Sequence, residues 1–280
     1  MMRRFTHRID RIATMYVPLG LFMLFFLLPL YWTLATALKR EGDILKRPIA
    51  YWPSPLTFDN FTFAWQNVGF STYFKNSLFV AGFTVAFVLV ISIFTGYALS
   101  RFKFRGKAGF MILLLCTQFV PSAMLLIPLF IMLKNMGLIG NYFSLILTYT
   151  TFQLPFNAIL MSSFISNVPE QLEEAAMVDG CTRLQSVIYV VLPLLIPGIV
   201  ATAAFTYIYA WNEFLFSLMF ISKHTMFTIP VGLNSMMGEY NINYGALAAG
   251  SMIALLPAVI LFMYVQKFLV QGITDGAVKG

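Results

Sequence analysis

Few residues of this 280-residue chain could carry out covalent chemistry, and none of them stands in a catalytic pattern. The sequence has no H-E-x-x-H motif, no nucleophile elbow and no pair of intramembrane aspartates. It also lacks the G-x-x-x-x-G-K-[ST] loop that holds the phosphates of ATP, so this chain cannot hydrolyse ATP by that route. His7 and His224 are too far apart for a metal-ligand spacing. We therefore expect no catalytic residue, no metal and no cofactor in the chain.

The polar stretch at 167–197, between two long apolar runs, offers a binding surface instead. It predicts a helix that begins near Pro169, which is favourable in a first helical turn. Gly180 suits the end of this helix because glycine adopts a positive φ without a steric clash, and Thr182 suits the N-cap of a second helix. The stretch also holds four of the eleven acidic residues, Glu170, Glu173, Glu174 and Asp179.

The first of these helices has one face of small and apolar residues, with Asp179 at its end. The residues that recur there at helical spacing are Leu172, Ala175, Ala176 and Asp179. Helices that lie on membranes are rich in Lys and Arg, so an acidic helix is poorly suited to lipid. Small side chains let another backbone approach closely. We interpret this face as a docking surface for another protein.

A second group of polar residues lies inside apolar runs. Glu213 is the one clear intramembrane acid, and a charge at the centre of a bilayer costs about 2.5–3.5 kcal/mol. It must therefore face a protein or water-filled interior, or lie near the membrane surface. Gln118, Gln153 and Asn157 either form hydrogen bonds between helices or line a path for a polar solute. A self-powered secondary transporter or channel that uses Glu213 for ion coupling is the alternative function.

The composition is that of an integral membrane protein. The chain is 59% hydrophobic, with a mean hydropathy of +0.80, and 10% of its residues are charged, against about 25% in soluble domains. Six transmembrane helices are predicted, at about 15–38, 77–100, 109–133, 142–165, 195–220 and 246–270. The first is too long for the apolar core of a signal peptide. The remaining segments are an N-terminal tail at 1–14, a loop at 166–194 and a C-terminal tail at 271–280.

The charges of the loops predict the orientation of these spans. Eleven of the eighteen Lys and Arg residues fall on the side of the N terminus, which places both termini and the acidic loop in the cytoplasm. Because the basic residues cluster beside apolar spans, we expect no nucleic-acid partner. The basic run at 101–107 is interpreted as a topology determinant, with lipid head-group binding as the alternative. Residues 39–75, with a short helix near 59–66, form an interfacial aromatic belt, a docking surface for an extracellular partner, or both.

Seven positions of the acidic loop resemble the E-A-A loop of the permease subunits of binding-protein-dependent ABC importers. They are Glu174, Ala175, Ala176, Asp179, Gly180, Leu192 and Pro193. The segments at 98–106, 211–214 and 272–280 are similar to the carbohydrate-importer branch, in particular its maltose-permease type, so the resemblance covers nearly the whole chain. The chain departs from the pattern at Cys181, where alanine is usual, and at Val190, where isoleucine is usual.

The resemblance implies an all-α fold of six transmembrane helices, the type I importer fold, with cytoplasmic coupling helices in a bacterial or archaeal cell membrane. It also implies a second, homologous permease, two copies of a cytoplasmic ATPase that bind ATP and Mg, and an extracellular solute-binding protein that delivers a sugar. The chain itself is then not an enzyme. The seven loop positions become the contacts to the ATPase, with Gly180 as the hinge. The expected residues of the sugar path are Asn212, Glu213, Gln153 and Asn157.

Overall fold

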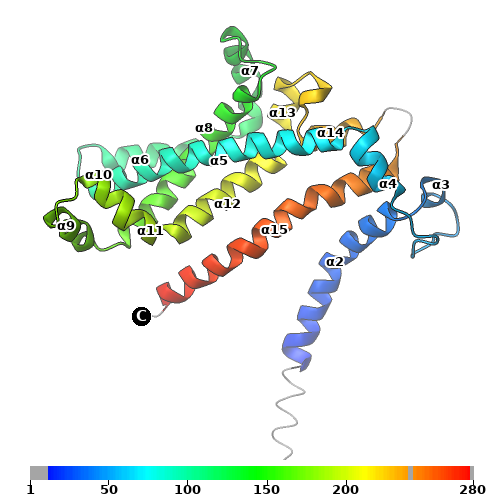
Figure 1. Cartoon of the computed structure of the whole chain (residues 1–280), viewed down its shortest axis with the longest axis horizontal. Helices are drawn as coiled ribbons and strands as arrows, with labels where there is room; N and C mark the ends of the chain where they lie inside the picture. Colours follow the sequence, from blue (N-terminus) through cyan, green and yellow to red (C-terminus); the bar gives the residue numbers. More distant parts are fainter. Residues whose placement is uncertain (1–11, 239–241, 278–280) are drawn as a thin grey trace, which may run out of the picture. The chain divides into compact units, whose positions relative to one another are not determined.

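A computed structural model describes residues 12–238 and 242–277 (Figure 1). The described residues form helices joined by loops, with one isolated antiparallel bridge between Met237 and Ile242. The chain divides into two units, Met1–Phe70 with Leu233–Leu255 and Ser71–Gly232 with Leu256–Gly280. Each unit is described separately below, with the helix labels of Figure 1.

The first unit contains most of the loop between the first two apolar runs. Its helices are η1 (Ile12–Tyr16), α2 (Val17–Ala37), α3 (Glu41–Ile44), α4 (Asp59–Thr62), η2 (Phe63–Asn67) and the first part of α15 (Tyr244–Ala277). The short helix predicted near residues 59–66 is confirmed by α4 and η2.

Small residues, and hydrogen bonds between side chains and the backbone, hold this unit together. Five alanines form its core, Ala37, Ala64, Ala246, Ala248 and Ala249. The Asn60 side-chain amide donates to the carbonyls of Ala37 (2.8 Å) and Lys39 (2.6 Å), which would otherwise lack partners at the end of α2. The Glu41 carboxylate accepts from the N–H groups of Tyr244 (2.8 Å) and Gly245 (2.7 Å) at the start of α15, where a negative charge is favourable.

The second unit contains the second part of α15 and the remaining helices. They are α5 (Phe70–Arg101), α6 (Lys107–Thr117), η3 (Ser122–Leu125), α7 (Leu126–Asn135), α8 (Tyr142–Ser166), α9 (Glu170–Val178), α10 (Arg183–Ser186), η4 (Val187–Val191), α11 (Leu192–Leu194), α12 (Ile196–Asn212), α13 (Leu215–Phe220), η5 (His224–Met226) and α14 (Ile229–Ser235). Of these, α5 begins one residue before the unit and α14 continues beyond it.

The helices agree with the predicted number of spans. Four helical stretches within the described residues are long and apolar enough to cross a membrane, Thr14–Ala37, Phe70–Arg101, Tyr142–Ser166 and Tyr244–Phe268. Two pairs of helices reach the same criterion together, Lys107–Thr117 with Ser122–Asn135 and Arg183–Leu194 with Ile196–Asn212. With each pair counted as one span, the described residues contain six.

The structure divides the third and fifth apolar runs, each of which was predicted as one span. The third bends by 89° between α6 and η3, where Pro121 lacks an N–H group for the helical ladder. In the fifth, α12 begins after a bend of 77° and ends at Asn212. Glu213 is then extended, and α13 forms a separate short helix. The run predicted at 195–220 is therefore two helices with a break at its only acid.

Helical structure extends into the segments that were predicted as terminal tails. Helix α15 continues to Ala277, so the segment predicted as a C-terminal tail at 271–280 is helical over most of its length. The predicted N-terminal tail at 1–14 lies mostly outside the described residues, and helix η1 has already begun at Ile12.

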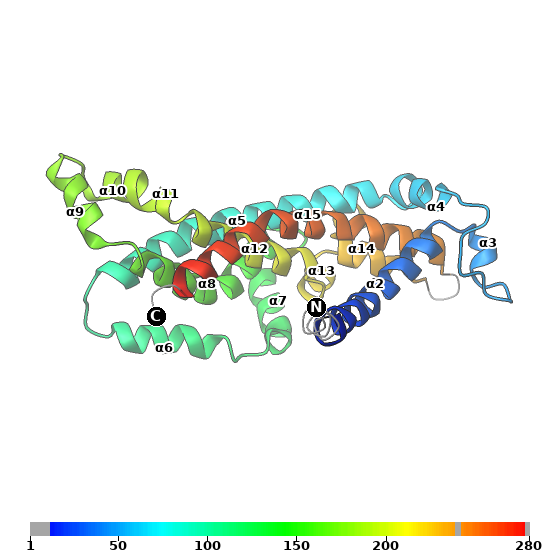
Figure 2. The ribbon, with the colours of Figure 1, turned by 90° about the horizontal axis from the view of Figure 1, so that it is seen from below.

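A core of apolar side chains lies under the acidic loop in the second unit. It joins the end of α5, the end of α8, η4 and the residue before α12, through Tyr97, Met161, Ile165, Val168, Val187, Val191 and Leu195. Helix α5 approaches α8 closely at Gly96, where an added Cβ would lie 2.8 Å from the Ser162 nitrogen. This core packs beneath the segment that contains α9, α10 and α11. The three helices are labelled in Figures 1 and 2.

Candidate functional site

The acidic loop folds as the predicted helix–turn–helix. Helix α9 ends in a turn at Gly180, whose φ of +96° is in the left-handed region that glycine adopts without strain. Thr182 then caps α10 through a capping box, with the Gln185 N–H 3.3 Å from Oγ1 of Thr182 and the Thr182 N–H 2.8 Å from Oε1 of Gln185. Pro169 was expected in the first turn, but it has extended backbone and stands one residue earlier, at the N-cap.

One side of α9 is open to solvent. Val178 is 87% exposed and Leu172 is 44% exposed. Glu174, Ala175, Asp179 and Gly180 are also exposed, whereas Ala176 is half-buried. Leu192 packs partly against the core beneath the loop, and Pro193 is exposed. The structure therefore presents most of the predicted docking residues on an accessible surface of apolar and acidic groups.

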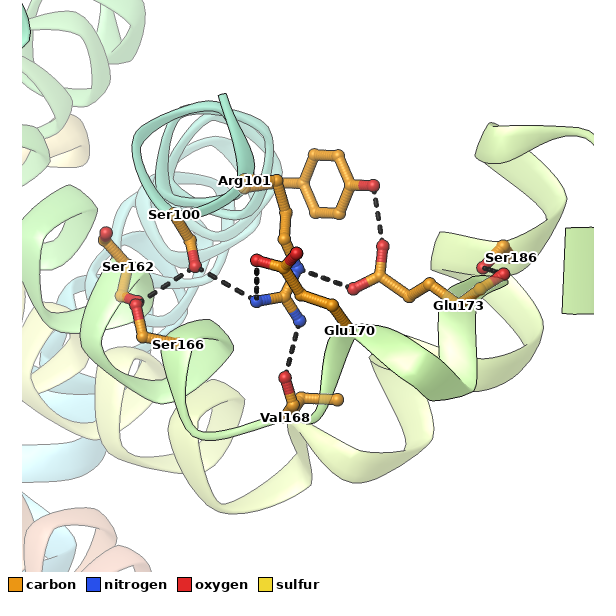
Figure 3. Close-up of polar contacts among 9 residues, drawn as sticks. Ser100, Arg101, Ser162, Ser166, Val168, Glu170, Glu173 and Ser186 are labelled. Atoms are coloured by element: carbon orange, nitrogen blue, oxygen red, sulfur yellow. Dashed lines mark hydrogen bonds and ion pairs between the residues drawn. The ribbon is translucent and has the colours of Figure 1, made fainter. Parts of the chain in front are cut away.

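The opposite side of α9 is held by a buried ion pair between Glu173 and Arg101, the last residue of α5 (Figure 3). Nε of Arg101 donates to Oε1 of Glu173 at 2.7 Å, and both side chains are only 7% exposed. The Tyr97 hydroxyl donates to the second carboxylate oxygen at 2.7 Å. The guanidinium also donates to the carbonyl of Val168, before α9, at 2.8 Å. The name anchor is used below for these four residues.

Weaker contacts surround the anchor. The carboxylate of Glu170 lies 3.8 Å from the Arg101 guanidinium and is largely exposed. The guanidinium of Arg183, in α10, lies over the ring of Phe102 at 5.2 Å. The hydroxyls of Ser100 and Ser166 are 3.0 Å apart and join the ends of α5 and α8 (Figure 3). These contacts place charged groups from α5, α9 and α10 in one cluster.

The anchor gives the first member of the basic run at 101–107 a further role. Lys103 and Arg105 are exposed, whereas the Arg101 side chain is buried against Glu173. The sequence did not indicate that Arg101 and Tyr97 contact the acidic loop. Their spacing of four residues, on one face of a helix, was the available signal.

Of the predicted path residues, Asn212 is exposed and Glu213 is half-buried, and both form hydrogen bonds within the chain. The Glu213 carboxylate accepts from the Tyr149 hydroxyl at 2.5 Å and from the N–H groups of Phe216 (2.9 Å) and Ser217 (3.1 Å). It therefore caps the start of α13. Asn212 is exposed, and its side-chain amide donates to the Ile208 carbonyl within its own helix.

Gln153 and Asn157 lie in α8, and Asn157 is fully buried. The Asn157 amide donates to the Gln153 carbonyl at 2.8 Å and to the Thr206 hydroxyl of α12 at 3.3 Å. Of the two roles considered for Asn157, this geometry supports the hydrogen bond between helices. The Oδ1 atom of Asn157 and the hydroxyls of Thr150 and Thr202 are buried and have no hydrogen-bond partner among the described residues.

Comparison with known proteins identifies the family. The model of the binding-protein-dependent transport system inner membrane component matches residues 88–275. The chain is 38% identical over 252 residues to the diacetylchitobiose uptake system permease protein DasC of Streptomyces coelicolor, covering 90% of this chain and 91% of the relative. It is 32% identical over 257 residues to the trehalose/maltose transport system permease protein MalG of Thermococcus litoralis, covering 91% and 92%.

A solved structure supports the fold. The crystal structure of a bacterial ABC transporter involved in the import of the acidic polysaccharide alginate superposes with a TM-score of 0.82 at 23% identity, over 93% of this chain and 97% of that chain. The permeases of this family bind no cofactor, and ATP is bound and hydrolysed by partner subunits. The chain therefore belongs to the family of binding-protein-dependent ABC transporter permeases, in its carbohydrate-importer branch, and is a multi-pass inner-membrane subunit of such a transporter.

Proposed function

We propose that the exposed side of α9 is the site at which a cytoplasmic ATPase docks on this permease. The observation that carries the proposal is the division of α9 into two sides. Glu173 is bound to α5, whereas Glu174, Ala175 and Val178 are exposed and form no part of the core. An exposed set of apolar side chains beside acidic ones is typical of a surface that is covered by a partner. Three positions that match the E-A-A pattern, Glu174, Ala175 and Asp179, lie on this exposed side, and Gly180 follows it in the turn.

The proposed complex contains this chain, a second homologous permease, two copies of the ATPase and an extracellular solute-binding protein. Its orientation, with both termini and α9 in the cytoplasm, is supported by the excess of Lys and Arg on that side. Closure of the ATPase pair on ATP would then move α9, and the spans would open toward the binding protein. The ATPase residues that meet Glu174 and Asp179 are expected to be basic, because both carboxylates are exposed.

The proposed solute is a mono- or oligosaccharide. Relatives that match over most of this chain are named for the transport of diacetylchitobiose, of trehalose and maltose, and of sulfoquinovosyl glycerol. Their solutes all contain a sugar ring, which supports the proposed class without selecting one member.

The alternative, a self-powered transporter that uses Glu213, loses its support in the geometry. Both oxygens of that carboxylate already accept hydrogen bonds. Two of the three bonds come from backbone N–H groups at the start of α13. An acid that couples ion flow to transport must exchange partners during each cycle, whereas a helix cap keeps them.

The docking site is tested with Gly180→Asp in the tagged chain, co-expressed with the second permease and the ATPase. The substitution adds a charge beside the exposed side of α9. It also adds backbone strain of up to about 2 kcal/mol, because aspartate must adopt the left-handed conformation of Gly180. We expect the amount of co-purified ATPase to fall about tenfold, which corresponds to a loss of about 1.4 kcal/mol of binding, and sugar uptake to fall with it.

Gly106→Asp is the matched control. Gly106 also has a positive φ (+90°), and no atom lies within 4 Å of an added Cβ at either glycine. The control therefore carries the same strain and the same added charge, but in the loop between α5 and α6 and not in the turn that follows α9. Equal recovery of ATPase and equal uptake in both variants would refute the docking site.

A further inference from the structure

The anchor joins two helices that are far apart in the sequence. Arg101 and Glu173 are 72 residues apart, and the chain between them includes α6, α7 and α8. By its covalent connections alone, α9 is joined only to α8, through residues 167–169, and to α10, through the turn at Gly180. Any direct link from α9 to α5 must therefore be made by side chains.

The anchor holds α9 at two points on α5. Tyr97 and Arg101 are one helical turn apart, and each donates to a different oxygen of the Glu173 carboxylate. The same guanidinium also binds the Val168 carbonyl, just before α9 begins. A rotation of α9 about its own axis, or a displacement of its first turn, would break at least one of these bonds.

The surroundings of the anchor make these bonds strong. Both charged side chains are removed from water, and a charge-assisted hydrogen bond in such an environment is stronger than one at an exposed surface. Separation of the pair would leave a buried charge without a partner. The anchor therefore resists deformation more than the largely exposed contact between Glu170 and Arg101 does.

We propose that the anchor is the element that passes the movement of α9 directly to α5, and that Arg101 is a positioning residue for the coupling of ATP hydrolysis to transport. The inference rests on the proposed function of α9 as the docking helix. A displacement of α9 by the ATPase is transmitted through Glu173 to Tyr97 and Arg101, at the end of the 32-residue helix α5. Without the anchor, α9 would move with the ATPase and α5 would not move with α9.

The test uses the complete transporter in liposomes, with the binding protein and a transported sugar, and measures sugar taken up and ATP hydrolysed in the same vesicles. The variants are Arg101→Gln, which removes the charge, and Tyr97→Phe, which removes one hydroxyl and leaves the ion pair and the ring in place. We expect the sugar transported per ATP to fall at least about fivefold in Arg101→Gln and by a smaller factor in Tyr97→Phe. The amount of ATPase co-purified per molecule of permease should remain at the wild-type value.

Arg105→Gln is the control, because Arg105 belongs to the same basic run but is exposed; its ratio of sugar to ATP should stay at the wild-type value. A fall in the amount of assembled complex with an unchanged ratio in the remaining complexes would show a merely structural role and overturn the inference. Tyr97→Phe keeps the test decisive if Arg101→Gln does not assemble, since a wild-type ratio in that variant would also overturn it. Failure of the docking site itself is seen separately, as wild-type ATPase recovery in Gly180→Asp.

Discussion

Two carboxylates in the second unit, Glu173 and Glu213, have similar surroundings and different roles. Each accepts a hydrogen bond from a tyrosine hydroxyl, Tyr97 at 2.7 Å and Tyr149 at 2.5 Å. The remaining partners differ. Glu173 is paired with the guanidinium of a distant helix, whereas Glu213 accepts from backbone N–H groups three and four residues later. The first carboxylate therefore links separate helices, and the second stabilises a local break in the chain.

The difference shows why an acid inside an apolar run of a membrane protein is weak evidence for transport chemistry. A lone carboxylate between apolar runs suggests ion coupling when only the sequence is known. In the structure, Glu213 accepts from backbone N–H groups and is a helix cap. Glu173 is paired with Arg101 and is the candidate for transmission of movement. Glu173 is buried and Glu213 is half-buried, and it is their hydrogen-bond partners that indicate their roles.

The largest expected effect is on stability and comes from removal of one member of the ion pair. Glu173→Leu leaves the Arg101 guanidinium buried without its carboxylate, and we expect the free energy of unfolding to fall by about 3–5 kcal/mol. The measurement is denaturant unfolding of the purified chain in detergent. The double variant Arg101→Met/Glu173→Leu removes both charges and should recover most of the loss. If the double variant is as unstable as the single one, the anchor contributes by packing and not by charge.

A smaller effect is expected at the second carboxylate. Glu213→Ala leaves the N–H groups of Phe216 and Ser217 without their cap, and we expect a loss of about 1–2 kcal/mol in the same unfolding measurement. Glu213→Gln keeps an oxygen that accepts hydrogen bonds and should lose about 1 kcal/mol or less.

Uptake by the Glu213→Gln variant then distinguishes the two roles considered for this acid. We expect ATP-driven sugar uptake by the assembled transporter to remain within about twofold of wild type, because a helix cap does not exchange a proton or an ion during the cycle. Abolished uptake in a variant that assembles normally would show that Glu213 belongs to the transport machinery, and the comparison with Glu173 would then fail.

The smallest effect is expected from the tyrosine hydroxyl beside Glu213. Tyr149→Phe removes one of the three hydrogen bonds to Glu213, and we expect a loss of about 1 kcal/mol in unfolding. The ratio of sugar transported to ATP hydrolysed should stay at the wild-type value, in contrast to Tyr97→Phe. Equal ratios in the two tyrosine variants would remove the functional difference between the two carboxylates.

The sequence determined the membrane character, the six apolar runs and the helix–turn–helix. Apolar length and low charge are summed over each run and do not depend on which helices pack together. The stop at Gly180 and the cap at Thr182 follow from local backbone geometry, so residue type alone predicted both. The E-A-A pattern was also recognisable, because its positions are close together in the chain.

Only the tertiary structure showed which acidic residue of α9 is buried. Glu170, Glu173 and Glu174 lie within the first turns of one helix, and their sequence context does not separate them. The choice depends on the position of α5, which packs closely against α8 at Gly96 and places Tyr97 and Arg101 beside α9. The role of Glu213 also depended on the structure, since the break after Asn212 supplies the N–H groups that it caps. Contacts between distant segments, and a break such as the one at Glu213, depend on packing that a one-dimensional pattern does not contain, whereas the bend at Pro121 has a local cause.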